Sequence, residues 1–146
     1  MSDQQLYQAV ILEHNKKPRN FGELEEATHK AEGFNPLCGD RFNVYMSVDG
    51  SGKIETVKFE GHGCAISKAS ASLMTDALKG KTTQEAEALF ENFHNMVTGK
   101  SENADSLGKL RIFSTVSRFP SRVKCAALAW HTMKGALANE AQISTE

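Results

Sequence analysis

The stretch FNVYMSVDGSGKIETVKFEGHGCAISKASASLMTDAL, residues 42–78, decides the fold. Its first half alternates apolar and polar residues over 42–48 and again over 54–60, with Asp49-Gly50-Ser51-Gly52 between the two runs. Alternation with a period of two is typical of half-buried strands, and a short connection rich in Asp and Gly is a hairpin signal. These residues therefore predict a two-stranded antiparallel unit.

The second half of the stretch changes period at Cys64. Its apolar residues recur at helical spacing, and Gly80 follows the run in the position of a helix C-cap. The pattern predicts a helix that begins at Cys64. The apolar stripe consists of Ile66, Ala69, Leu73, Met74, Ala77 and Leu78.

Helices are also predicted on both sides of this stretch. The first is amphipathic, runs from a cap at Asp3 and ends before Pro18. Thr82 followed by Glu85 forms a capping box for a helix that extends through Met96. A last helix, capped by Ser121 and reaching about residue 139, is apolar almost all round and belongs in the core.

An isolated hairpin is only marginally stable, so we expect the segment before Cys38 to add an edge strand. The predicted fold class is α+β, with a small antiparallel sheet of about three strands packed against several helices. No repeat, low-complexity tract or linker divides the chain, which we expect to form one domain over residues 1–146.

Composition narrows the classes of function. The chain has 17 basic and 18 acidic side chains and no basic cluster interleaved with aromatic residues, so we do not expect it to bind nucleic acid. It has no apolar run long enough to cross a membrane and no secretory signal at its start. We therefore expect a cytoplasmic protein with reduced thiols and no membrane partner.

Three cysteines carry the chemistry, and an odd number of them cannot form a disulfide framework. Cys38 lies in the turn-forming segment Asn35-Pro36-Leu37-Cys38-Gly39-Asp40, where no apolar stripe could explain it as core. Cys64 is at a helix N-terminus, where free amide hydrogens and the helix dipole favour a thiolate. Cys125 lies on the apolar last helix, where a buried packing role and a ligand role are about equally expected.

Cys38, Cys64 and Cys125 with the carboxylate of Asp40 make four candidate metal ligands. Three thiolates and one oxygen suit tetrahedral zinc. The cysteines are much farther apart in sequence than those of zinc fingers or ferredoxins, so the tertiary fold would have to gather them. His62 could replace Asp40 as the fourth ligand, although it could equally face a partner.

The chain resembles the iron–sulfur assembly proteins of the IscU/NifU N-terminal type, and most closely their SufU branch. Three separate cysteine motifs carry the resemblance, together with segments that cover nearly the whole chain. In the scaffold branch a histidine directly precedes the third cysteine, whereas Lys124 stands there in this chain. The matching segments are residues 10–14, 18–22, 35–40, 59–67, 69–74 and 122–130.

The resemblance implies a fold in which a small antiparallel sheet packs against helices. It also implies a zinc-dependent sulfur acceptor that stimulates a partner cysteine desulfurase of the SufS type. Cys38 would be the acceptor, and Asp40, Cys64 and Cys125 would hold zinc. The Fe–S assembly machinery or apo-proteins would receive the sulfur.

Two other functions remain open from the sequence. In one, the same ligands take iron or a transient Fe–S cluster in place of zinc, and the protein is a scaffold for cluster assembly. In the other, Cys64 acts with a histidine as a cysteine hydrolase, although no oxyanion motif accompanies it. Arg122, three residues before Cys125, is either a surface charge or a cation that stabilises thiolate or persulfide near the metal.

Overall fold

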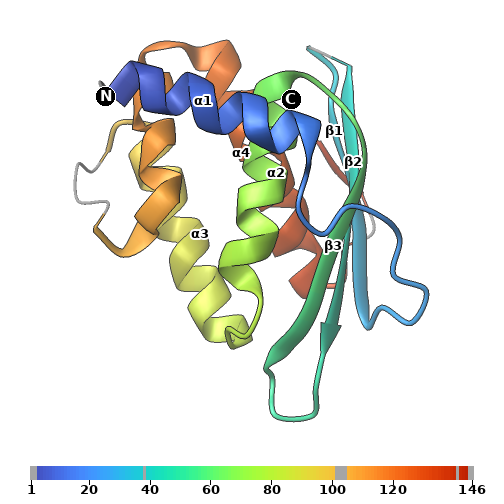
Figure 1. Cartoon of the computed structure of the whole chain (residues 1–146). Helices are drawn as coiled ribbons and strands as arrows, with labels where there is room; N and C mark the ends of the chain where they lie inside the picture. Colours follow the sequence, from blue (N-terminus) through green and yellow to red (C-terminus); the bar gives the residue numbers. More distant parts are fainter. Residues whose placement is uncertain (1–2, 38, 101–104, 141, 145–146) are drawn as a thin grey trace.

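A computed structural model describes residues 3–37, 39–100, 105–140 and 142–144 (Figure 1). In Figure 1 the helices gather on one face of a twisted sheet, and α1 crosses above the others. The elements are α1 (Asp3–Lys16), β1 (His29–Asn35), β2 (Asp40–Val48), β3 (Ile54–His62), α2 (Ala65–Leu78), α3 (Thr83–Val97), the 3-10 segment η1 (Asp105–Arg118), α4 (Pro120–Leu137) and β4 (Gln142–Ser144).

The sheet has the strand order β3-β2-β1-β4. Strands β1, β2 and β3 pair antiparallel, with Val44 opposite both Ala31 and Phe59, which confirms the predicted hairpin and the extra strand before Cys38. The prediction that this extra strand is an edge is wrong, because β4 pairs parallel to it. Three residues are too few for an alternation to reveal β4 in the sequence.

The helices cover the apolar face of the sheet. Phe42 and Phe59, from β2 and β3, are fully buried and lie 5.9 Å apart between ring centroids. On the helical side, the ring of Trp130 stacks on Phe93 at 4.4 Å. The α+β class predicted from the sequence is confirmed, and the core lies between the sheet and α2, α3 and α4.

The helix boundaries follow local capping. Cys64 is the N-cap of α2, and Thr82 and Glu85 form the predicted capping box of α3. The prediction that Ser121 caps α4 is wrong, because the helix begins at Pro120 after Phe119. Proline is favoured at the first helical position, where its fixed φ is already helical and its missing N–H needs no partner.

The segment η1 has no counterpart among the predicted elements. Its backbone breaks at Gly108, where φ is 56°. Its buried apolar residues are spaced by three, which is the repeat of a 3-10 helix. This spacing is the sequence signal that could have revealed the element. The residues are Leu107, Leu110, Phe113 and Val116.

None of the described helices has the length and apolar character needed to cross a bilayer.

Candidate metal centre

Three elements bring one candidate ligand each to a common point. Asp40 is the first residue of β2, Cys64 is the N-cap of α2, and Cys125 lies in the second turn of α4. One carboxylate oxygen of Asp40 and the two sulfurs all lie within 4.8 Å of one another. Cys38 is outside the described residues, so its role as fourth ligand and sulfur acceptor stays a prediction.

The carboxylate of Asp40 is buried, with 2% of the residue exposed. Its Oδ1 accepts a hydrogen bond from the backbone N–H of Cys64 at 2.9 Å, and its Oδ2 accepts one from the hydroxyl of Ser67 at 2.6 Å. A buried carboxylate needs such partners because an unpaired charge away from water is strongly unfavourable. The two bonds hold Asp40 against the N-terminus of α2.

Ser67 is a supporting residue that sequence analysis did not single out. Its backbone N–H donates to the sulfur of Cys64 at 3.4 Å, while its hydroxyl also lies 3.1 Å from the carbonyl oxygen of Cys125. One side chain therefore contacts all three ligand residues. The signal in the sequence is Ser67 itself, three residues after an N-cap, where the amide of the first turn points back to the capping atom.

The glycines around His62 allow Cys64 to approach β2. Gly61 has φ of +132°, and a Cβ there would collide with the carbonyl oxygen of Arg41. A Cβ on Gly63 would lie 2.8 Å from the ring of Phe42 and 3.0 Å from Oδ1 of Asp40. Any larger side chain at these positions would push the N-terminus of α2 away from Asp40.

The environment of Cys64 favours its thiolate. A hydrogen bond from the thiol of Cys125, together with those from Ser67, lowers the pKa of Cys64 to about 6, against the opposing effects of burial and of Asp40. Asn35, fully buried at the end of β1, places its amide nitrogen 3.9 Å from the sulfur of Cys125. Both sulfurs thus have neighbours that stabilise negative charge.

These residues fit a zinc ion by the chemistry of their donors. Two thiol sulfurs and one carboxylate oxygen are ligands that zinc takes in tetrahedral sites. The hydrogen bonds from Ser67 to Asp40 and to Cys64 orient the ligands in the way that partners of metal ligands do. The described residues would supply three ligands and leave one position for Cys38.

Tyr7 of α1 lies near this centre, and no sequence motif singles it out. Its hydroxyl is the one buried side-chain polar atom that has no hydrogen-bond partner among the described residues. Burial raises the pKa of Tyr7, Arg122 lowers it, and Cys64 and Cys125 raise it further. The hydroxyl is therefore close enough to the two cysteines and to Arg122 to feel their charges.

The two remaining predicted site residues lie at the rim. His62 is the exposed last residue of β3 and does not join the Asp40, Cys64 and Cys125 group. Arg122 is exposed in the first turn of α4, with its guanidinium 4.5 Å from the centroid of the Phe119 ring. Their functional roles stay predictions.

The fold and site define a class of small α+β protein in which separate elements gather cysteines and one aspartate. A family model for the NifU-like N-terminal domain matches residues 6–126. The chain belongs to this family.

Two curated relatives are similar over most of their length. The zinc-dependent sulfurtransferase SufU of Bacillus subtilis is 43% identical over 136 residues, which cover 92% of this chain and 91% of the relative. The iron–sulfur cluster assembly scaffold protein IscU of Streptococcus pyogenes is 41% identical over 137 residues, covering 93% and 85%.

The fold is also found in solved structures. A crystal structure from Fervidobacterium islandicum, described as a scaffold protein of iron–sulfur cluster assembly for the SUF system, matches with a TM-score of 0.85. It is 41% identical, and the match covers 93% of this chain and 99% of that one.

Proposed function

We propose that this protein works in iron–sulfur cluster assembly as a zinc-dependent sulfur acceptor for a cysteine desulfurase. The proposal rests chiefly on the meeting of Asp40, Cys64 and Cys125, whose ligand atoms lie within 4.8 Å of one another. Cys38 is two residues from Asp40 in the chain, so it is close in sequence to the same point. The similarity to a zinc-dependent sulfurtransferase supports this function over the alternatives.

Zinc, when bound by Cys38, Asp40, Cys64 and Cys125, would keep the thiols deprotonated and shielded from oxidation. The protein's own residues prepare the site for this. Asp40 is fixed by two hydrogen bonds, and Cys64 has a lowered pKa. Gly39, with φ of +73°, gives the chain beside Cys38 a left-handed conformation that glycine adopts without strain.

The proposed transfer is a thiol–disulfide type of exchange. The thiolate of Cys38 attacks the outer sulfur of the desulfurase persulfide, and a new S–S bond forms on Cys38. The S–S bond of the desulfurase breaks, and its electron pair stays on the desulfurase cysteine as a thiolate. No net oxidation occurs, because one persulfide is converted into another.

Mass spectrometry after incubation with a desulfurase and cysteine tests the acceptor. We expect one added sulfur atom on Cys38 and none on the variant Cys38→Ser, because a hydroxyl cannot form a persulfide. Sulfur found only on Cys64 or Cys125 would contradict the assignment. Desulfurase turnover should be stimulated by the unaltered protein and not by the variant Cys38→Ser.

A partner must reach Cys38, so we expect its contact surface to include the Cys38 loop, His62 and Arg122. Arg122→Glu should weaken desulfurase stimulation while zinc content and melting temperature stay close to those of the unaltered protein, since an exposed charge changes stability by only about 0.5 kcal/mol. Lys53→Glu is the matched control, because Lys53 is exposed at the hairpin end opposite His62. Equal stimulation by both variants would remove Arg122 from this surface.

A second candidate is a scaffold on which a cluster is built, as the name of the Streptococcus relative indicates for that protein. Thiolate ligands also hold Fe–S clusters, so the donors allow it. Metal analysis of protein purified without chelator separates the two. One zinc and no visible absorption supports the acceptor, and a brown protein with iron and sulfide supports the scaffold.

A cysteine hydrolase has no comparable support. Within the described part of the chain, the side chain of Cys64 hydrogen-bonds with Ser67 and Cys125 and with no histidine. A general base would have to be within hydrogen-bond reach of the nucleophile.

A further inference from the structure

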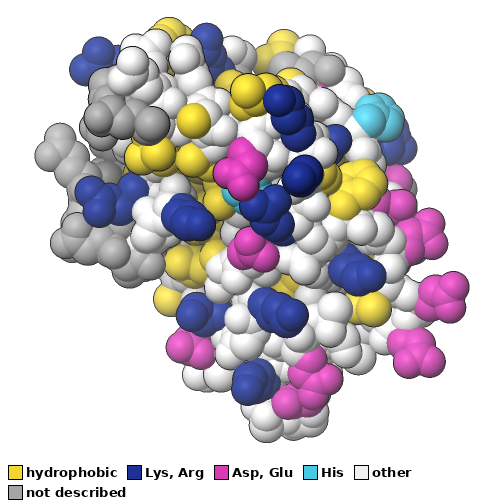
Figure 2. All heavy atoms as spheres, in the orientation of Figure 1, with side chains coloured by type: hydrophobic (Ala, Val, Ile, Leu, Met, Phe, Trp, Pro, Cys, Tyr) yellow, Lys and Arg dark blue, Asp and Glu magenta, His cyan; other side chains and the backbone are white. Residues whose placement is uncertain are grey.

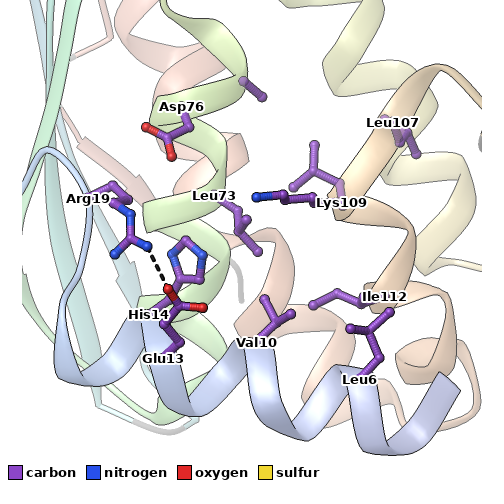
Figure 3. A pocket seen from close by; sticks show the side chains of 12 residues that line it. Leu6, Val10, Glu13, His14, Arg19, Leu73, Asp76, Leu107, Lys109 and Ile112 are labelled. Carbon is purple, nitrogen blue, oxygen red and sulfur yellow. Dashed lines mark hydrogen bonds and ion pairs between the residues drawn. The ribbon is translucent and has the colours of Figure 1, made fainter. Parts of the chain in front are cut away.

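A cavity of about 490 Å³ opens between α1, α2 and η1, and neither Cys64 nor Cys125 lines it (Figure 3). Its volume is within the range of small-molecule sites, which are mostly apolar with a few placed polar groups. Its walls have that character. The apolar residues that line it are Leu6 and Val10 of α1, Leu73 and Ala77 of α2, and Leu107, Leu110 and Ile112 of η1.

Apolar surface also reaches the outside of the molecule here. Leu6 is 43% exposed although it lines the cavity. Figure 2 shows apolar side chains gathered on the face where α1 and η1 lie, with acidic and basic side chains among them. The cavity is therefore accessible to a ligand from solution.

Some of the charged residues at the mouth of the cavity have an interaction partner and one does not. Arg19 is paired with Glu13 at 2.8 Å, and Asp76 accepts a hydrogen bond from Asn20 at 3.0 Å. Lys109 is exposed and makes no ion pair or hydrogen bond with any described residue, although its side chain extends into the cavity in Figure 3. One cation at the mouth is thus available to an anionic group.

His14 offers a second polar group on the wall. It is buried to 5% exposure, and its Nδ1 lies 2.6 Å from the hydroxyl oxygen of Ser72. That oxygen also accepts the backbone N–H of Arg19 at 2.7 Å, and we assign the hydroxyl proton to the hydrogen bond with Nδ1 of His14. The proton of the imidazole is then on Nε2.

The Nε2–H of His14 has no partner among the described residues, and it is not fully buried. His14 is one of the residues that line the cavity, and Nε2 is the ring nitrogen that the contact with Ser72 leaves without a partner. Burial, reinforced by Arg19, lowers the pKa of His14, so the ring is neutral at pH 7 and donates from Nε2 alone. A neutral donor and an ammonium group at one mouth match the two oxygens of a carboxylate.

We propose that this cavity binds an amphiphilic carboxylate, with the aliphatic part between α1, α2 and η1 and the carboxylate between Lys109 and His14. Glu13 does not oppose this because Arg19 neutralises it. Among the described residues that line the cavity, Asp76 is the one acidic side chain without a cation partner, and it limits the affinity. The chemistry is that of a medium-chain fatty acid.

The test compares three ligands that share one ten-carbon tail: decanoate, decan-1-ol and decyltrimethylammonium. Each is titrated into the zinc-loaded protein below its micelle-forming concentration, with calorimetry and amide chemical shifts as readouts. We expect decanoate to bind most tightly and the cation most weakly, with the shifts centred on Leu73, Ala77 and Leu110. Equal binding of all three, shifts centred elsewhere, or no saturation would overturn the proposal.

Two pairs of variants connect the binding to the cavity. Lys109→Glu should weaken decanoate about three- to fivefold, the effect of one exposed ion pair, whereas Lys16→Glu on the exposed end of α1 should not. Ala77→Trp should fill the cavity and abolish binding, whereas Ala88→Trp on the exposed face of α3 should leave it unchanged. Decanoate binding that is the same in all four variants would contradict the site.

Discussion

Ser67 and Ser70 lie one turn apart on α2. The first contacts the candidate metal ligands, and the second contacts the core. Both are buried, and both hydroxyls lie against the backbone of α4: that of Ser67 is 3.1 Å from the carbonyl oxygen of Cys125, and that of Ser70 donates to the carbonyl of Ala126 at 2.6 Å. Around Ser67 the other partners are Asp40 and Cys64. Around Ser70 the other partner is the indole N–H of Trp130 at 3.1 Å.

The difference shows how one helix pair serves two purposes. The contact at Ser70 fixes α4 to α2 through the largest side chain of the core. The contact at Ser67 uses that fixed spacing to hold the aspartate and two cysteines together. Positioning of the site thus depends on the spacing of α2 and α4 that the core fixes.

The largest expected effect is on the site side of this comparison. Cys64→Ala or Cys125→Ala should each release zinc from the purified protein and lower its melting temperature, because the binding energy of a metal held by the folded state adds to stability. Metal analysis and thermal unfolding with and without chelator measure both effects. A full equivalent of zinc in either variant would show that the site is wrong.

The paired serine variants sharpen the comparison directly. Ser70→Ala should lower the free energy of unfolding by about 1–3 kcal/mol, because it leaves the indole N–H of Trp130 unpaired, and zinc affinity should change much less than in Ser67→Ala. Ser67→Ala should weaken zinc about 10- to 100-fold, as loss of a partner of metal ligands does. Competition with a chromophoric chelator measures the affinities, and equal affinities would break the distinction between the regions.

The ionisation of Cys64 should make the stability of the metal-free, reduced protein depend on pH. The pKa of Cys64 is lowered in the folded state to about 6 from its ordinary value of 9.0, so between these values the unfolded chain binds more protons. The contribution of Cys64 to the free energy of unfolding should therefore be fully present above about pH 9, and it should be lost as the pH falls through about 6. Denaturant unfolding from pH 5 to 9 should show this rise, and the rise should be smaller in Cys64→Ser. An identical pH profile in that variant would assign the dependence to other groups.

The smallest expected effect concerns the unpartnered hydroxyl of Tyr7. Tyr7→Phe removes a buried donor that has no partner among the described residues, while the ring keeps its edge-to-face contact with Phe113 at 6.1 Å. We expect the metal-free variant to be more stable by up to about 1 kcal/mol. A loss of stability in denaturant unfolding would mean that the hydroxyl has a partner in solution.

Local sequence signals predicted the elements whose pattern is complete within a few residues. The alternation in β2 and β3, the change of period at Cys64 and the capping box at Thr82 each depend on neighbours in the chain, and the structure confirms all three. The start of α4 was misplaced because Pro120 and Ser121 are both good helix-initiating residues. The parallel strand β4 depends on β1, more than a hundred residues earlier, and has no local signal.

For the site, the sequence by itself determined which residue types could hold a metal: three cysteines and an aspartate in turn and helix-start positions. Only the tertiary structure decided that Asp40, Cys64 and Cys125 meet, that Ser67 contacts all three, and that His62 stays apart from them. The cavity beside His14 and Lys109 is likewise invisible in the sequence. The physical reason is that capping and periodicity act between residues a few positions apart, whereas a site built from β2, α2 and α4 exists only after burial of the core has fixed how those elements pack.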